Sequence, residues 1–236
     1  MIDRSLNYGR HLIEEFCIQS IPYSNVLDIG AGFGDDLMIA NKINPDCRMH
    51  ALEYYPSNII NLEEKEIQVS SIDLEKETFP YDNNNFDIVI ANQILEHTKE
   101  IFWIFHEISR ILKPGGKLIV GVPNLASMHN RLLLLFGHQP SPIKSASAHV
   151  RGFTKRDLIQ FINLCWPDGY NLIKWSGSNF YPFPPFISKP LARIFPSCAW
   201  GLFMLLKKER EYSNEFIQFP SNENLETNYF VGDNNN

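Results

Sequence analysis

An α/β fold with a mostly parallel sheet is the class that the sequence predicts. Strand-like apolar segments alternate with segments of helical periodicity from residue 8 to residue 122, and a glycine-rich turn joins the first strand directly to a helix. Strands that are connected through helices lie parallel in one sheet. The chain is 44% apolar and 20% charged, a composition typical of a packed globular protein rather than a disordered one.

The elements start with an amphipathic helix at residues 8–19, whose apolar positions recur at helical spacing and which Pro22 closes. Strands and helices then follow one another, with an acidic loop between the third and fourth strands. The expected strands are 24–29, 47–53, 67–71, 86–92 and 117–122, and the expected helices are 35–44, 57–65 and 101–112. Pro114-Gly115-Gly116 is expected to stop the last of these helices.

The second half of the chain departs from this alternation. Residues 124–150 are expected to be an insertion with a helix at 125–136, and Thr154 is expected to cap a helix that ends at Cys165. Residues 170–176 and 200–208 are expected to be two strands, separated by a second insertion, 180–196, which is rich in proline and aromatic residues. The predicted organisation is one domain, 1–208, followed by a polar and disordered tail, 209–236. The two insertions are expected to cap the side of the domain at which its substrate binds.

Charge and cysteine content exclude several classes of function. A net charge of −6 gives no basic footprint for nucleic acid. The four cysteines have no CxxC spacing, which argues against a zinc site and a disulfide framework. The first residues lack the apolar core of a secretory signal, and no apolar run approaches the roughly 20 residues of a transmembrane helix. We therefore expect a cytoplasmic protein.

The glycine turn after the first strand is the main signal for a bound nucleotide-like cofactor. Gly30, Gly32 and Gly34 give the spacing GxGxG, and Asp35 stands where the dinucleotide fingerprint has its third glycine. Acidic residues at this helix start would repel a pyrophosphate, whereas a cationic cofactor without phosphate suits them. Glu53 closes the next strand, where a carboxylate can accept hydrogen bonds from ribose hydroxyls.

Four segments together resemble the motifs of class I S-adenosylmethionine-dependent methyltransferases, in particular their small-molecule and sugar- or lipid-modifying branch. They are VLDIGAGFGDD from Val26, ALEYYP from Ala51, SSIDLEKETFPYDNNNFDIVIANQILEHT from Ser70, and RILKPGGKLIVGVPN from Arg110. The resemblance covers roughly Val26 to Asn124. It implies a Rossmann-like, doubly wound seven-stranded sheet, mostly parallel with one antiparallel strand, 200–208, near the edge.

The resemblance also implies the residues that hold S-adenosylmethionine and its product S-adenosylhomocysteine. Asp28 would orient the loop and the methionine moiety, Glu53 would hold the ribose, and Asn92 would face the methionine end. Asp73 would accept from the adenine amine, unless it only belongs to the acidic loop. The full set expected to contact the cofactor is Asp28, Gly30, Ala31, Gly32, Glu53, Tyr54, Ile72, Asp73, Leu74, Asn92, Gln93 and Ile94.

Two of the seven histidines are the candidates for a general base, because an oxygen acceptor gains from one and histidine is poised near neutral pH. His97 follows the fourth strand in the step LEH, although it can also simply cap the next helix. His149 follows the first insertion, and Arg151 beside it would bind an anionic group. No His/carboxylate pair has metal-binding spacing, so we expect no metal.

The acceptor is predicted only as a class. The fourth strand ends in ANQIL rather than in Asn/Asp-Pro-Pro-Tyr/Phe, the signature of exocyclic-amine methylation on nucleobases or glutamine, which again disfavours nucleic acid. We expect methyl transfer to a small-molecule or sugar acceptor, at oxygen. The sequence leaves open a quinone- or lipid-type acceptor, a non-catalytic protein that only binds S-adenosylmethionine, and a homodimer formed through the apolar insertions.

Overall fold

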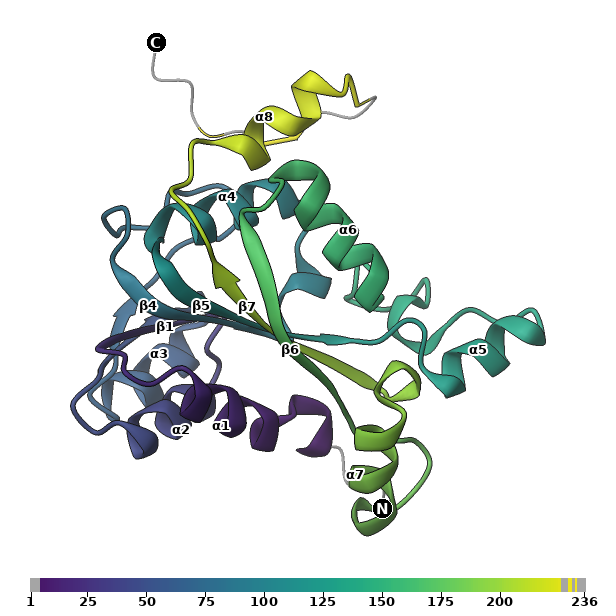
Figure 1. Cartoon of the computed structure of the whole chain (residues 1–236). Coiled ribbons are helices and arrows are strands. Elements are labelled where there is room, and N and C mark those ends of the chain that lie inside the picture. The colour runs from purple at the N-terminus through teal and green to yellow at the C-terminus, as the bar shows by residue number, and fades with distance from the viewer. Residues whose placement is uncertain (1–4, 226–228, 231, 233–236) are drawn as a thin grey trace.

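A seven-stranded sheet forms the centre of the computed structural model, which describes residues 5–225, 229, 230 and 232 (Figure 1). The strand order is β3-β2-β1-β4-β5-β7-β6, and only β7 runs antiparallel to its neighbours. The strands are β1 (Asn25–Ile29), β2 (Arg48–Leu52), β3 (Gln68–Ser70), β4 (Phe86–Asn92), β5 (Leu112–Pro123), β6 (Tyr170–Ser178) and β7 (Gly201–Lys208). The predicted doubly wound sheet, with one antiparallel strand near its edge, is confirmed.

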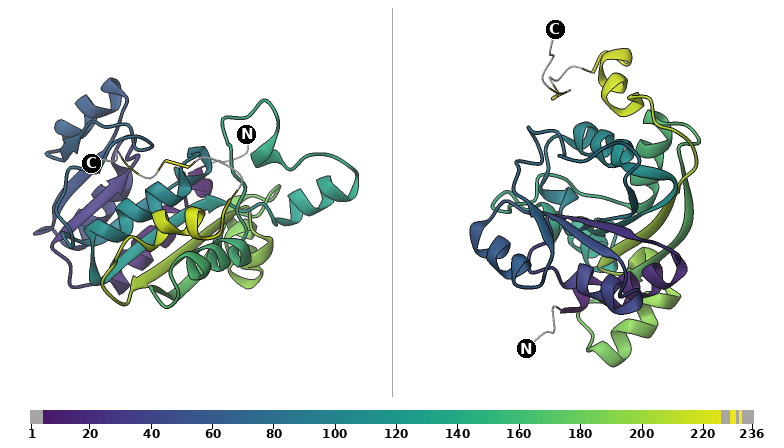
Figure 2. Two further views of the ribbon diagram at one scale, coloured as in Figure 1. Left: turned by 90° about the horizontal axis from the view of Figure 1, so that it is seen from above. Right: turned by 90° about the vertical axis from the view of Figure 1, so that its left-hand side faces the viewer.

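Helices cover both faces of the sheet, as the views in Figure 2 show from above and from the side. The helices α1, α2 and α3 lie on one face, and α4, α6 and α8 lie on the other (Figure 1). The α-helices are α1 (Arg10–Gln19), α2 (Asp35–Ile43), α3 (Pro56–Glu63), α4 (Ile101–Ile111), α5 (Met128–Leu135), α6 (Lys155–Cys165), α7 (Pro185–Ile194) and α8 (Glu215–Asn222). Short 3₁₀ turns lie at Ser5–Tyr8, Leu95–His97, Ser141–Ile143 and Pro196–Cys198.

Burial explains why the central strands form where the sequence predicts them. Every residue of β1 is buried, and so are most residues of β4. A strand covered on both faces reads as a continuous apolar run, which is the pattern of parallel sheets between helix layers. The two apolar clusters of the core lie on opposite faces of this sheet, one under α4, α6 and α8 and the other under α1 and α2.

The predicted boundary between α4 and β5 is wrong. The helix ends at Ile111, and β5 already begins at Leu112, so Pro114-Gly115-Gly116 lies within the strand. Phe86 pairs with Leu112 and Ile88 pairs with Lys117, which leaves residues 113–116 as a bulge in β5. The bulge absorbs the proline and the glycines without breaking the ladder beyond it.

Two segments for which the sequence analysis predicted no regular structure contain helices. Residues 180–196, expected only as an insertion, hold α7, with Pro185 in its first turn and Pro190 inside it. The segment from residue 209, expected to be a disordered tail, holds α8. Phe216 of α8 is fully buried among the aromatic rings of Phe105 and Trp166, and this burial compensates for the polar composition that suggested disorder. The tail residues 226–228, 231 and 233–236 lie outside the described ones.

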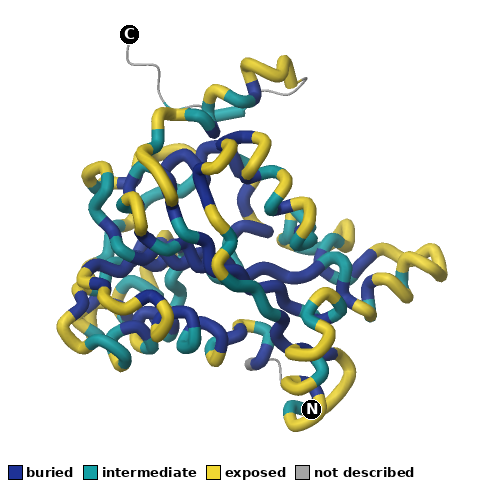
Figure 3. The backbone as a smooth tube through the Cα atoms, viewed as in Figure 1, coloured by how far each residue is buried: buried dark blue, intermediate teal, exposed yellow. Residues whose placement is uncertain are grey.

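The insertion after β5 projects from the body of the molecule and leaves it through a stem. Asn124 forms a parallel bridge with Phe153, and the backbone N–H of Leu125 donates to the carbonyl of Phe153 at 2.8 Å. Beyond the stem, α5 is largely exposed, as the yellow segment in Figure 3 shows. Ser127 caps α5, and Thr154 caps α6 as predicted, its Oγ1 accepting from the Asp157 N–H at 3.1 Å.

Across the described residues, no helix is both long enough and apolar enough to cross a bilayer.

Candidate functional site

The glycine loop lies at the carboxyl end of β1 and leads into α2. Gly30 and Gly32 have φ of +69° and +55°, backbone conformations that side chains with a Cβ rarely adopt. A Cβ on Gly30 would approach Ile94 Cδ1 to 2.7 Å, whereas a Cβ on Gly32 would meet no atom within 4 Å. Gly30 is therefore required by packing, and the space beside Gly32 is open to a ligand.

Glu53, directly after β2, holds this loop in place. Its Oε2 accepts a hydrogen bond from the Gly32 N–H at 2.8 Å, and its Oε1 accepts from the N–H groups of Tyr54 and Tyr55, each at 2.9 Å. The side chain is buried. A carboxylate offers about four acceptor positions, so these three bonds leave about one for a ribose hydroxyl. Contact with both ribose hydroxyls would displace one of the three amides.

A buried acidic group lies beneath the loop. Asp28 of β1 is buried, and burial, followed by the charges of Asp36 and Glu53, raises the pKa of its carboxyl well above the ordinary value. Burial also raises the pKa of Asp36, whose Oδ2 accepts from the Asn92 Nδ2 at 2.7 Å. A cationic ligand would stabilise the ionised forms of these carboxyls. The group thus favours positive charge and disfavours phosphate.

A cavity of about 360 Å³ opens at the carboxyl ends of β1, β2 and β4. This volume is typical of small-molecule sites, and the carboxyl ends of parallel strands are where open α/β sheets bind ligands. Seven of the residues predicted to hold the cofactor line it, namely Gly30, Glu53, Tyr54, Ile72, Asp73, Leu74 and Ile94. Leu52, Tyr55, Glu75, His97 and Thr98 complete the lining.

The other five predicted cofactor residues, Asp28, Ala31, Gly32, Asn92 and Gln93, do not line this cavity. Asn92 instead donates to the Tyr8 carbonyl at 3.0 Å as well as to Asp36, on the face of the sheet that α1 and α2 cover. Gln93 has a positive φ of 56° at the end of β4. The contacts predicted for these five residues stay predictions.

Asp73 lies on the cavity wall but is engaged within its own loop. Its Oδ2 accepts from Lys76 Nζ at 2.7 Å and its Oδ1 from the Glu75 N–H at 3.0 Å. The hydrogen bond from Lys76 holds the pKa of the Asp73 carboxyl below its usual value. Asp73 thus orders the acidic loop and also lines the cavity, and its contact with adenine stays a prediction.

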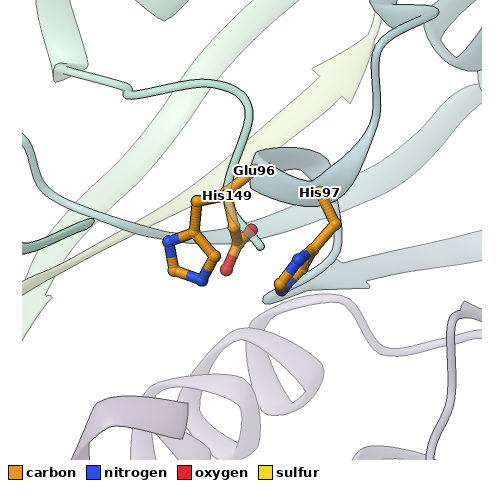
Figure 4. Close-up of side chains that lie close together, drawn as sticks. All are labelled: Glu96, His97 and His149. Carbon is orange, nitrogen blue, oxygen red and sulfur yellow. The ribbon is translucent and has the colours of Figure 1, made fainter. Parts of the chain in front are cut away.

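His97 and His149, the two candidate bases, lie against each other although they come from different loops (Figure 4). Their ring centroids are 4.6 Å apart in an edge-to-face arrangement. The carboxylate of Glu96 lies between the two rings. This residue is 1% exposed, and its Oε2 has no hydrogen-bond partner among the described residues. The sequence analysis missed Glu96, since nothing in the step LEH indicates which of its side chains turns inward.

Arg151 has a structural role. Its guanidinium donates to the backbone carbonyls of Thr98 at 3.1 Å and Lys99 at 2.5 Å. The backbone N–H groups of Val150 and Arg151 also donate to the Glu96 carbonyl, at 2.8 and 3.2 Å. The anionic group that we expected for Arg151 is replaced by these carbonyls, which bind the segment carrying His149 to the segment carrying His97.

The two insertions meet near this end of the sheet. The rings of His129 in the first and Tyr181 in the second lie 5.0 Å apart. Beyond this contact both insertions carry large exposed apolar side chains, which include Leu134, Leu135, Phe136, Phe183, Phe186 and Ile194.

Comparison with known proteins supplies the family context. Residues 27–120 match the family described as methyltransferase domain. Demethylmenaquinone methyltransferase of Bacillus mycoides is 27% identical over 105 residues, which are 42% of this chain and 44% of that enzyme. The chain spans less than half the length of the curated relatives it matches first.

Solved structures share the fold over most of the chain. A methyltransferase in complex with the Haloferax volcanii Trm112 methyltransferase activator superposes with a TM-score of 0.61 at 15% identity, covering 89% of this chain and 92% of that one. The plantazolicin methyltransferase BpumL, in complex with S-adenosylhomocysteine, superposes with a TM-score of 0.60 at 16% identity, covering 88% of this chain and 87% of that one.

Proposed function

The chain carries a class I S-adenosylmethionine-dependent methyltransferase domain at residues 27–120, and from this premise we propose that it transfers the methyl group of S-adenosylmethionine to an oxygen of a small-molecule or glycan-type acceptor. The family and the cofactor are those that the glycine turn and the following motifs predict. The reaction is an in-line displacement at the methyl carbon. The protein's task is to align the acceptor and to exclude water.

The observation that carries the proposal is that the cofactor cavity and the candidate base share a wall. Gly30, Glu53 and Asp73 line one cavity together with His97, and His149 contacts the ring of His97. An acceptor that enters beside the histidines therefore lies next to the cofactor. This proximity is the main requirement for a reaction whose activated group the cofactor already carries.

The charges around the cavity suit S-adenosylmethionine. The cofactor has a sulfonium and an ammonium group and no phosphate, and the buried carboxyls near the glycine loop are those of Asp28, Asp36 and Glu53, of which Glu53 lines the cavity. Glu53 retains an acceptor position for a ribose hydroxyl after its three backbone bonds. These features support binding of S-adenosylmethionine in this cavity.

The two histidines are proposed as the groups that take the acceptor's proton. Burial and the neighbouring His97 lower the pKa of His149, so its ring is neutral near pH 7 and can accept a proton. His97 Nδ1 lies 3.3 Å from the carbonyl of Ala148. Because a carbonyl only accepts hydrogen bonds, Nδ1 carries the proton and Nε2 holds the free lone pair.

A quinone- or lipid-type acceptor is the second candidate, and one observation favours it. The contact between His129 and Tyr181 joins the two insertions, which carry most of the exposed apolar side chains near the site. The relative from Bacillus mycoides, which is named for a menaquinone precursor, supports the same candidate. The acidic net charge of −6 continues to disfavour nucleic acid as a partner.

Calorimetric titration with S-adenosylmethionine and with S-adenosylhomocysteine tests whether the protein binds the cofactor. We expect both to bind, and ATP and NAD to give no heat of binding as controls. A screen with methyl-labelled S-adenosylmethionine then offers glycosides, phenols and reduced quinones as acceptors. Absence of binding by either cofactor form would overturn the enzyme proposal, and binding without transfer to any acceptor would favour the non-catalytic alternative.

A further inference from the structure

We propose that Glu96, His97 and His149 form a binding site for a divalent transition-metal cation such as Zn²⁺ at the edge of the cofactor cavity. One carboxylate oxygen and one nitrogen from each imidazole lie within 4.8 Å of one another. Figure 4 shows the carboxylate of Glu96 between the two rings. A single cation placed between three such atoms can contact all of them after small side-chain rotations, because Zn²⁺ bonds are about 2.0–2.2 Å long.

The buried carboxylate of Glu96 is the first independent sign that a ligand is required. The side chain is 1% exposed, and its Oε2 makes no hydrogen bond to any part of the chain that the structure describes. A buried acceptor without a donor is costly, and buried charges in proteins are normally paired or bound to a metal. A cation at this point would supply the missing partner.

The two histidines can each offer a ring nitrogen to a metal. His149 contributes one ring nitrogen to this group, and its ring lies beside the Glu96 carboxylate in Figure 4. Only the neutral imidazole has a lone pair for a metal. His97 Nδ1 faces the Ala148 carbonyl, which leaves Nε2 as the ligand atom. A ligating histidine that donates its other N–H to a backbone carbonyl is the usual arrangement at metal sites.

The surrounding backbone holds the three groups together without an ion. The Val150 N–H donates to the carbonyl of Glu96, and the Arg151 guanidinium donates to the carbonyls of Thr98 and Lys99. These bonds join the loop after β4 to the end of the first insertion on both sides of the histidines. The site is therefore preformed, and binding does not have to order a loop.

The ligand set indicates the class of metal and leaves room for another ligand. Two imidazoles and one carboxylate suit first-row transition cations, whereas Mg²⁺ and Ca²⁺ prefer oxygen ligands. Three protein ligands leave at least one position for water or for an acceptor oxygen. If the proposed methyl transfer holds, an acceptor hydroxyl bound there would lie beside the cofactor cavity with a lowered pKa. This last role rests on the proposed function, whereas metal binding itself does not.

Titration of the chelator-treated full chain, free of any polyhistidine tag, with ZnCl₂ tests the site. We expect one ion per chain, and we expect Glu96→Gln, His97→Asn and His149→Asn each to weaken Zn²⁺ binding by about 100-fold or more. Cobalt titration provides a second readout, since Co²⁺ bound by imidazole nitrogens in a low-coordinate site absorbs in the visible range. His138→Asn, at an exposed histidine of the same insertion, should leave both titrations unchanged.

The outcomes separate the metal site from the proposed function. Zn²⁺ binding by the wild type that is no tighter than binding by the three ligand variants would overturn the site, as would an equal effect of His138→Asn. Far-ultraviolet circular dichroism and thermal melting verify that each variant is folded, because His97 lines the cofactor cavity and its replacement alone can weaken cofactor binding. S-adenosylhomocysteine binding is measured on the same wild-type preparation. Tight Zn²⁺ binding without cofactor binding would support the site and contradict the proposed function, and the reverse result would contradict only the site.

Discussion

The carboxylate of Glu53 accepts a hydrogen bond from the backbone N–H of Gly32 at 2.8 Å. This bond joins the end of β2 to the loop after β1, so the acidic residue and the glycine turn are one structural unit. Glu53 therefore shapes the loop in addition to offering its carboxylate to a ligand. Substitutions at either residue are expected to weaken cofactor binding. Glu53→Gln does so by removing a charged acceptor, and Gly32→Ala by adding a methyl group and straining the backbone.

Replacing Glu53 by Gln should weaken binding of S-adenosylhomocysteine by about 10- to 100-fold. The neutral amide loses a charge-assisted acceptor, worth about 1.5–3 kcal/mol when it binds a ligand hydroxyl or a backbone donor. Calorimetric titration measures the change. Glu63→Gln, at an exposed residue of α3, is the matched control and should bind like the wild type. Unchanged affinity in Glu53→Gln would remove the ribose assignment.

Replacing Gly32 by Ala should reduce cofactor affinity by more than tenfold at a small cost in stability. Its φ of +55° strains any residue with a Cβ by roughly 1 kcal/mol, and the added methyl enters the space left open for a ligand. Gly115→Ala is the control, since Gly115 has a φ of +83° and equally open surroundings far from the cavity. Thermal melting should show similar losses for both, and titration should show a loss of affinity only for Gly32→Ala.

Replacing His149 by Asn should lower kcat by about 100-fold or more while cofactor affinity changes by less than about twofold. The His149 ring does not itself line the cavity and reaches it only through the ring of His97, which does. Steady-state assays with the acceptor found in the screen, beside titration with S-adenosylhomocysteine, give the two values. A variant that loses cofactor binding and turnover together would place His149 in the cofactor site instead.

Acidification should destabilise the protein partly through His106. Burial lowers the pKa of this residue from 6.5 to about 4, so the unfolded chain binds its proton at a higher pH than the folded one. The stabilisation is complete above pH 6.5 and is lost as the pH falls towards 4, by up to about 3 kcal/mol.

Denaturant unfolding between pH 7 and pH 4 measures this dependence. The free energy of unfolding should fall less steeply in His106→Gln than in the wild type, whereas His138→Gln, at an exposed histidine, should follow the wild-type curve. Parallel curves for the wild type and His106→Gln would show that His106 is protonated in the folded protein over this range.

Replacing Phe216 by Ala should cost about 3–5 kcal/mol of stability, because its ring is fully buried between α4 and α6. Chemical denaturation measures the loss. Gln218→Ala, at an exposed position of the same helix, should change stability by less than about 0.5 kcal/mol. Two variants of equal stability would show that α8 is not part of the folded core.

The sequence predicts most of the sheet because its central strands carry the strongest patterns. The bounds of β4 are those predicted, since the apolar run from Ile88 to Ala91 is typical of a strand covered on both faces. The helices α7 and α8 were missed for two different reasons. Prolines hide the periodicity of α7, and α8 is a short helix with Pro220 inside it that lies between polar segments. Both helices form because tertiary packing supports them, which a local pattern does not reveal.

The candidate site also has one part that the sequence predicts and one part that it does not. Gly30 and Glu53 lie in continuous motifs, and the motif order alone places them at one edge of the sheet. The group of Glu96, His97 and His149 depends instead on a hydrogen bond between two loops that are distant in the sequence. No spacing along the chain predicts that bond. The expectation of no metal considered only the spacing of residues along the sequence, and it stays a prediction that the zinc titration tests.

The stem at which Asn124 bridges Phe153 makes the intervening segment a separable cassette. Its two ends are held by the same pair of strand-like residues, and lengthening a closed loop costs little entropy, roughly 0.6 kcal/mol for each doubling. Exchanging residues 125–149 would therefore leave the cofactor half of the protein unaltered. Because His149 lies at the end of the cassette, such an exchange would, if the proposed function holds, change both the surface offered to the acceptor and one of the proposed bases in a single step.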